Sequence, residues 1–264
     1  MKKIICLVLA VCLTACLFAG CGKNDDKTAS DASEAQKTAE VIKFGTNAEF
    51  PPFEFVAANG VIDEFDGIDI CIAKEIAEQN GATAKIENME FDSLLVALQN
   101  KQIDAVIAGM TATDERKESV NFSTPYYKAT QVMIVKEDST IAKAADMADK
   151  KIVVIQGYTG ETCVKDMGYN YESFKKGTEA VMELVNGKCD VVVIDSATAS
   201  KYVKDNPGLK IVEDSEAFET EEYAVAVNKD NTELLEKINK AIDKLLADGK
   251  VNEYAAKYAE VTEE

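Results

Sequence analysis

Two segments of the chain, ALQNKQIDAVIAG (97–109) and ELVNGKCDVVVID (183–195), align with each other without a gap. Each segment has the pattern of a helix end, a polar turn and a buried apolar strand. Identical residues stand in register, among them Leu98 and Leu184, Asn100 and Asn186, and Asp104 and Asp190. The repeat predicts an α/β protein built from two similar lobes, each with its own sheet.

Short apolar runs alternate with helical patterns through the rest of the chain. Candidate strands are the runs 41–46, 103–108, 131–136, 151–156, 189–194 and 223–228. Helical spacing of apolar residues is found at Ile68, Ile72 and Ile76, at Leu94, Leu95 and Leu98, and at Leu234, Leu235, Ile238, Ile242, Leu245 and Leu246. Because the strands are apolar throughout, we expect parallel sheets covered by helices.

The ends of the repeated strands indicate where a ligand would bind. In open α/β sheets, ligands bind beyond the carboxyl ends of the strands. In the repeat these ends are Gly109 and Asp195. Two facing lobes would therefore bring Gly109 and Asp195 to opposite walls of one cleft.

The segment GMTATDER (109–116) has the residue types of a site for a small carboxylic acid. Gly109 allows a ligand to approach the backbone closely. Thr111 or Thr113 is a candidate N-cap of the helix that begins here, and a helix N-terminus favours an anion. Arg116 adds a planar fork that fits a carboxylate, although the neighbouring charges also fit a solvated helix arginine.

Asp195 follows the apolar run Val191 to Ile194 directly. A carboxylate at the end of a buried strand can accept the ammonium group of a ligand. The same side chain could instead cap the helix that starts near Ser196. Both roles remain open from the sequence.

Composition excludes several classes of function. The chain of 264 residues has a formal charge of −18, which argues against nucleic acid as a partner. It has no histidine, so histidine-based acid–base catalysis and histidine-ligated metal are excluded. Cys71, Cys163 and Cys189 have no spacing typical of a metal site or a disulfide framework. No Walker A pattern is present, and we expect a binding protein with no cofactor and no metal.

The N-terminus has the pattern of a lipoprotein signal peptide over residues 1–20. Two lysines precede the apolar stretch Ile4 to Ala19, and small residues precede Cys21. Cys16 is the alternative lipidation site and an uncleaved membrane anchor the alternative interpretation; we prefer Cys21 because polar sequence follows it directly. Residues 21–40 lack aromatic and large aliphatic side chains after Cys21, which predicts a disordered tether.

Four blocks of the sequence resemble the polar amino-acid solute-binding proteins of bacterial ABC importers. They are GTNAEFPPFEF (45–55), GIDICIAKEIAE (67–78), MEFDSLLVALQ (89–99) and IAGMTATDERKESVNFSTPYY (107–127). The resemblance implies the type II periplasmic-binding-protein fold, with the ligand in a cleft between two lobes. Residues 41–130 and 224–264 would form lobe one, residues 131–223 lobe two, and 126–130 and 219–223 the hinge crossings.

The resemblance also implies a set of substrate-binding residues: Asn47, Phe50, Phe91, Ala108, Gly109, Met110, Thr111, Arg116, Gln156, Thr159 and Asp195. In this set Arg116 would hold the ligand's carboxylate and Asp195 its ammonium group. Phe50 and Phe91 would sandwich the side chain. Asn47 stands where several members have an aspartate, which implies a neutral site. Tyr158 stands where family members often carry a small residue or threonine. Whether its side chain narrows the pocket or points outward is left open, and so is the role of Glu54.

The resemblance implies a lipid-anchored, extracytoplasmic receptor that captures a polar L-amino acid. Its partners would be a membrane permease and an ATPase, with the lipid as its contact with the membrane, and it would act as a monomer. A cleft enzyme that resembles cyclohexadienyl or arogenate dehydratases is one alternative, and an amino-acid sensor module is another. Arginine, lysine, histidine, glutamine and cystine all remain open as ligands.

Overall fold

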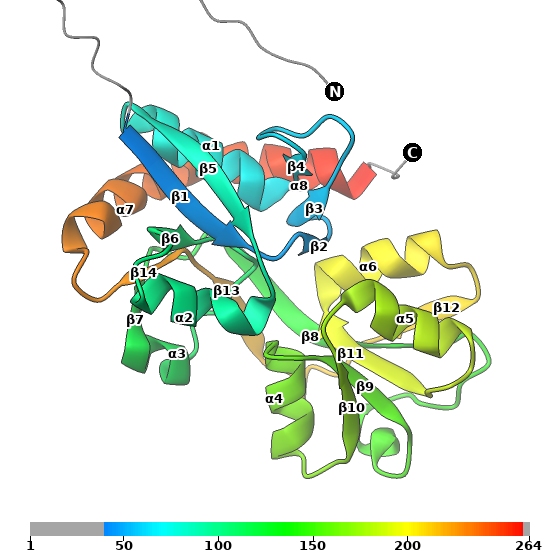
Figure 1. Cartoon of the computed structure of the whole chain (residues 1–264). Helices are drawn as coiled ribbons and strands as arrows, with labels where there is room; N and C mark the ends of the chain where they lie inside the picture. The colour runs from blue at the N-terminus through cyan, green and yellow to red at the C-terminus, as the bar shows by residue number, and fades with distance from the viewer. Residues whose placement is uncertain (1–39, 261–264) are drawn as a thin grey trace, which may run out of the picture. The chain divides into compact units, whose positions relative to one another are not determined.

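The computed structural model describes residues 40–260. The signal peptide, the lipidation site at Cys21 and the tether up to residue 39, which are all predictions from the sequence, lie outside these residues. Within the described part, two sheets form the cores of two α/β lobes (Figure 1).

The first sheet has the strand order β5-β1-β6-β14-β7. Its strands are β5 (Ala82–Asn88), β1 (Glu40–Thr46), β6 (Ala105–Val106), β14 (Ala226–Asn228) and β7 (Val120–Phe122). Strand β1 runs parallel to β5 and β6, whereas β14 runs antiparallel to β6 and β7. A small neighbouring sheet consists of β2 (Glu49–Phe50), β3 (Glu54–Val56) and β4 (Phe65–Asp66).

The second sheet has the order β10-β9-β11-β8-β12, and β13 pairs with β8. Its strands are β10 (Tyr171–Phe174), β9 (Ile152–Ile155), β11 (Val191–Asp195), β8 (Tyr127–Lys136), β12 (Leu209–Val212) and β13 (Thr220–Tyr223). Strand β9 is parallel to β10 and β11, but β8 is antiparallel to β11, β12 and β13.

The expectation of parallel sheets was therefore wrong in part, since both sheets are mixed. The chain enters the second lobe along β8 and leaves it along β13 in the opposite direction, so these two strands pair antiparallel. Apolar runs do not distinguish this arrangement from a parallel one, because a strand buried on both faces is apolar in either direction.

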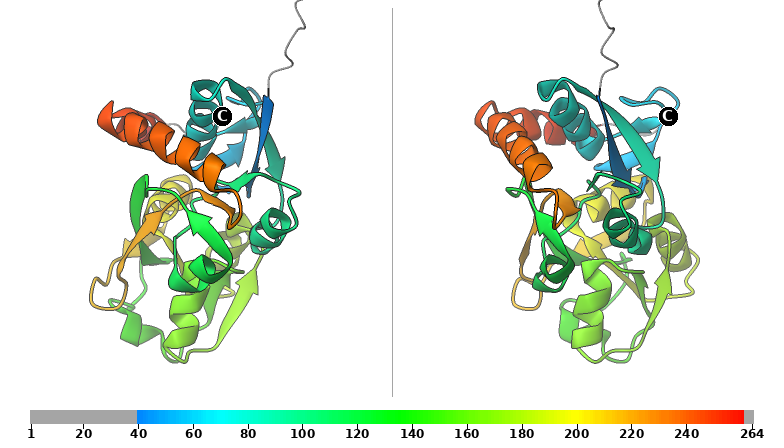
Figure 2. Two further views of the ribbon diagram at one scale, coloured as in Figure 1. Left: turned by 90° about the vertical axis from the view of Figure 1, so that its left-hand side faces the viewer. Right: turned by 60° about the vertical axis from the view of Figure 1, so that its left-hand side comes forward.

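Helices cover both sheets (Figures 1 and 2). The first lobe carries α1 (Ile68–Gln79), α2 (Leu94–Gln99), α3 (Asp114–Ser119), α7 (Thr232–Ala247) and α8 (Lys250–Glu260). The second carries α4 (Thr159–Asp166), α5 (Gly177–Val185) and α6 (Ser196–Asp205). Short 3₁₀ turns lie at Phe91–Ser93 and Ala144–Met147. Between residues 40 and 260, no helix combines the length and apolar character that a membrane span needs.

The helical spacings predicted real helices. Ile68, Ile72 and Ile76 form the buried face of α1. In α7 most of the spaced residues are buried, but Leu246 is exposed. A side chain at the end of a helical stripe can extend past the core, so spacing alone does not show that it is covered.

Two predicted strands are shorter than their apolar runs. The run 103–108 is strand only at Ala105–Val106, because Gly109, with a φ of 50°, turns the chain toward α3. The run 223–228 is interrupted at residues 224 and 225. Its first residue pairs with the second sheet and its last residues with the first, so this segment passes from one lobe to the other.

The sequence repeat is also a structural repeat. Asn100 and Asn186 end α2 and α5, and the residues that follow them, Lys101 and Gly187, have φ values of 58° and 70°. Asp104 Oδ2 accepts the backbone N–H of Lys43 at 2.8 Å. At the aligned position, Asp190 Oδ2 accepts the backbone N–H of Lys151, also at 2.8 Å. Each aspartate thus ties its turn to the neighbouring parallel strand.

Candidate ligand-binding site

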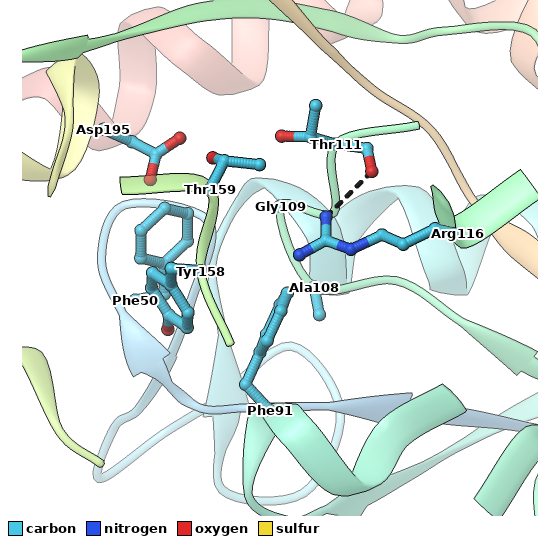
Figure 3. A pocket seen from close by; sticks show the side chains of 9 residues that line it. All are labelled: Phe50, Phe91, Ala108, Gly109, Thr111, Arg116, Tyr158, Thr159 and Asp195. Carbon is cyan, nitrogen blue, oxygen red and sulfur yellow. Dashed lines mark hydrogen bonds between the residues drawn. The ribbon is translucent and has the colours of Figure 1, made fainter. Parts of the chain in front are cut away.

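One small cavity lies between the lobes (Figure 3). Its lining residues are Phe50, Phe91, Ala108, Gly109, Thr111, Arg116, Tyr158, Thr159 and Asp195. All of them except Tyr158 belong to the predicted binding set. Of that set, the structure does not place Asn47, Met110 or Gln156 on this cavity. Met110 lines an adjoining cavity of about 630 Å³, and Phe91 and Arg116 line this cavity as well.

Arg116 is held by both lobes. Thr113 is the N-cap of α3, and its Oγ1 accepts the Arg116 N–H at 3.2 Å. The guanidinium donates from Nη1 to the Thr111 carbonyl at 2.8 Å and from Nη2 to the Gly157 carbonyl at 2.9 Å. It lies 5.3 Å from the centroid of the Phe91 ring. A guanidinium has five N–H donors, so these bonds leave others for an anion.

Asp195 ends β11 and lies at the N-cap position of α6, but its side chain makes no capping hydrogen bond. Its Oδ1 instead accepts a hydrogen bond from the Tyr223 hydroxyl. The carboxyl group is buried. Burial, and then the charge of Glu221, raise its pKa to about 7. A ligand ammonium beside it would reverse this effect and favour the ionised form.

Glu221, on β13, connects hydroxyl groups from both lobes. Its Oε2 accepts hydrogen bonds from Thr111 Oγ1 and Thr159 Oγ1, each at 2.7 Å. Gln131 Nε2 lies 3.4 Å from the same oxygen. The sequence reasoning missed Glu221, although it lies in the predicted crossing 219–223. Its signal in the sequence was an acidic residue in a crossing segment that was expected to pass beside the cleft.

Tyr158 points into the site. Its ring centroid lies 5.2 Å from that of Phe50 and 4.6 Å from that of Phe91, with edge-on geometry in both pairs. Its hydroxyl and Asn47 Oδ1 are 3.2 Å apart, and Asn47 Nδ2 donates to the Met89 carbonyl at 2.9 Å. The Tyr158 side chain therefore points inward and narrows the cavity, and the Asn47 amide is bonded to its hydroxyl.

Gln156 is exposed at the edge of the cleft. Its Nε2 donates to Asp92 Oδ2 at 3.0 Å, so it joins the lobes outside the cavity. The predicted direct contact of Gln156 with a ligand therefore has no support in this arrangement.

A layer of buried carboxyl groups supports the Gly109 loop. Asp69 Oδ2 accepts the Gly109 N–H and the Tyr126 hydroxyl, both at 2.7 Å. Burial raises the pKa of Asp69 to about 7, and burial together with Asp69 raises that of the fully buried Glu54 well above its usual range. Glu54 is therefore buried close to Asp69 and does not line the cavity.

Comparison with known proteins shows the family of the chain. The model of the bacterial extracellular solute-binding proteins, family 3, matches residues 42–261. The chain belongs to this family.

Relatives of this solute-binding protein carry the names of several ligands. The ABC transporter arginine-binding protein 1 of Escherichia coli K12 is 38% identical, over 80% of this chain and 87% of its own. A probable histidine-binding protein of Neisseria gonorrhoeae is 33% identical, over 98% of this chain and 96% of its own. A crystal structure of the arginine-, lysine-, histidine-binding protein ArtJ from Geobacillus stearothermophilus has 35% identity and a TM-score of 0.77, over 83% and 95% of the two chains. These likenesses show the two-lobed fold.

The chemistry of this solute-binding protein's site is that of a binding pocket. Within residues 40–260 there is no cluster of cysteine and acidic side chains that could hold a metal ion. The charged groups at the cavity form a cation and a carboxylate on opposite sides, with threonine hydroxyls between them (Figure 3).

Proposed function

We propose that this solute-binding protein captures one polar L-amino acid between its lobes and delivers it to the permease of an ABC importer. The ATP chemistry would belong to a partner ATPase. The names of the relatives, which are binding proteins for arginine and histidine, support an amino acid as ligand.

The observation that carries the proposal is the placement of Arg116 and Asp195 on one small cavity. A guanidinium is suited to a bidentate bond with a carboxylate, and a buried carboxylate to an ammonium group. Every free amino acid carries both partners at a fixed separation. Thr159 is the first residue of α4, and its backbone N–H adds a donor for the ligand's carboxylate.

The lobes would close around the ligand. Arg116 belongs to the first lobe and Asp195 to the second, so one zwitterion can bond to both. The hinge crossings at 126–130 and 219–223 and the lobe bounds 41–130, 131–223 and 224–264 belong to this proposal. Its thermodynamic basis is that the ligand makes more contacts in the closed state than in the open one.

The protein would act outside the cytoplasm, as a monomer anchored through lipid on Cys21. The family name, extracellular solute-binding proteins, supports the location. Cys21→Ser should release the protein from membranes or leave it uncleaved. Release by Cys16→Ser and not by Cys21→Ser would move the anchor to Cys16.

The direct test is a calorimetric screen of the purified protein against the twenty amino acids, cystine and ornithine. At least one L-amino acid should bind, and its D-enantiomer should bind much more weakly. Arg116 and Asp195 would hold the carboxylate and the ammonium, and the remaining walls of the cavity would supply the third contact that distinguishes the two positions of the side chain. Failure of every L-amino acid to bind would refute the proposal.

A further inference from the structure

We propose that Tyr158 fills the side-chain subsite, and that the protein therefore selects a polar L-amino acid with a small side chain, of the size of serine. The inference rests on the proposed function, since it assumes that the Arg116 and Asp195 site binds amino acids. It adds a specificity-determining residue and a ligand class.

Tyr158 occupies the space between the two phenylalanines that would sandwich a ligand side chain. Its ring is in edge-on contact with Phe50 on one side and with Phe91 on the other. Protein interiors are close-packed, so a second group cannot share this space. A long side chain such as that of arginine could lie between Phe50 and Phe91 only if Tyr158 moved out.

Several contacts oppose that movement. Tyr158 is only 6% exposed. Its hydroxyl bonds to Asn47 Oδ1, and the bond from Asn47 Nδ2 to the Met89 carbonyl fixes which way the amide faces. Removal of the ring would leave the buried Asn47 oxygen without this partner and open a cavity between aromatic rings, and both effects are unfavourable.

The space that remains is small. The centre of a water molecule has about 10 Å³ in which to move, which is roughly the room for one water. The backbone of an amino acid needs more than this. Arg116, which lines the cavity, is only half-buried and can shift to make that room. A long side chain that entered the space between Phe50 and Phe91 would in addition require the displacement of the buried Tyr158. The adjoining cavity of about 630 Å³ is lined by Phe91 and Arg116 but not by Phe50, Tyr158 or Asp195, so it is not this subsite.

The two charged side chains on the cavity are suited to groups that all free amino acids carry. Arg116 and Asp195 line the cavity and match the carboxylate and ammonium that all amino acids share. The Asn47 amide, which would have recognised a polar side chain, is bonded to Tyr158 and Met89. The site thus retains the contacts to the carboxylate and ammonium of a ligand, whereas the amide that could select a polar side chain is already bonded within the protein. The ligands in the names of the relatives need not apply to this chain, because Tyr158 departs from the family's small residue or threonine.

The test compares the wild type, Tyr158→Thr and Tyr158→Phe by calorimetry with alanine, serine, arginine, histidine and glutamine. Threonine suits this position, because residue 158 is the N-cap of α4. The wild type should bind serine about tenfold or more tightly than arginine. Tyr158→Thr should gain affinity for arginine or glutamine by about tenfold. Tyr158→Phe, which keeps the ring, should still reject them.

The outcomes separate this inference from the proposed function. If the wild type binds arginine, histidine or glutamine more tightly than serine, the inference is overturned and the proposed function stands. If neither the wild type nor Tyr158→Thr binds any amino acid, both fail. Should Tyr158→Thr fail to fold, judged by circular dichroism, the selectivity of the wild type decides the question by itself.

Discussion

The Arg116 guanidinium donates a hydrogen bond to the Gly157 carbonyl at 2.9 Å, and so joins the start of α3 in one lobe to the loop before α4 in the other. The same side chain bonds to Thr111 in its own lobe. A cation placed in this way acts on both walls of the cleft. Its loss should affect ligand binding more than folding, because a cleft opened to water solvates the groups that remain.

Arg116→Ala should weaken amino-acid binding by about 2–5 kcal/mol, the usual cost of truncating one member of a buried charge pair. The midpoint of thermal unfolding without ligand should change little. The matched control is Lys117→Ala, which removes an exposed cation from the next position of the same helix. If calorimetry shows that Arg116→Ala binds the amino acid as tightly as Lys117→Ala does, Arg116 is not part of the site.

Gly109→Ala should destabilise the protein through two separate effects. Gly109 has a φ of 50°, where residues with a Cβ are strained, and an added Cβ would come within 2.5 Å of the Phe50 ring. Gly81→Ala isolates the first effect, because Gly81 has a φ of 67° and no atom within 4 Å of the added Cβ.

We expect Gly81→Ala to cost about 1–2 kcal/mol of unfolding free energy. Gly109→Ala should cost more than this, because the ring of Phe50 must also move. Urea unfolding of both variants measures the difference. Equal losses would mean that the Phe50 ring moves aside freely.

The pH dependence of stability should reflect the buried carboxyl groups of Asp69 and Asp195. Burial raises the pKa of each to about 7 from a usual value of 3.8. Between these values the folded protein binds more protons than the unfolded chain, so stability falls as the pH rises. This contribution is fully present below pH 3.8 and is lost as the pH passes through about 7.

Denaturant unfolding of the ligand-free protein at pH 5.5, 7 and 8.5 would measure this decline. Asp69→Asn, which cannot ionise, should make the decline less steep. An Asp69→Asn protein with the slope of the wild type would show that Asp69 stays ionised across this range.

Asp195 should be required for closure of the lobes. Ligand binding should reduce the radius of gyration in solution scattering, because one zwitterion bonds to both lobes. With Asp195→Ala the reduction should be absent even at concentrations that saturate Arg116. A wild-type scattering profile unchanged by bound ligand would contradict the two-lobe closure, although Arg116 and Asp195 could still form the site.

Much of the local structure could be predicted from the sequence, because neighbouring residues in the chain decide it. The spacing of Ile68, Ile72 and Ile76 determines one face of α1, and Thr113 caps α3 through a residue three positions away. The repeated turns after Asn100 and Asn186 follow the same logic. The mixed strand directions could not be predicted, because the apolar pattern of β8 is the same for a parallel and an antiparallel partner.

Most of the residues that line the cavity could be predicted from the sequence, but its shape could not. The segment 109–116 and Asp195 indicated a cation and a carboxylate facing one another, since each follows a buried strand of the repeat. Whether Tyr158 points inward depends on Asn47, which is 111 positions away. The contact of Glu221 with Thr111 spans 110 positions.

The sequence by itself thus determined the main helices of this protein, its repeat, and Arg116 and Asp195 as charged groups of the candidate site. Only the tertiary structure decided how much space those groups enclose and which side chain occupies it. The physical reason is that helix caps and periodicity act over a few residues. Side-chain direction, desolvation and the pKa of Asp195 arise from packing between segments that are distant in the chain.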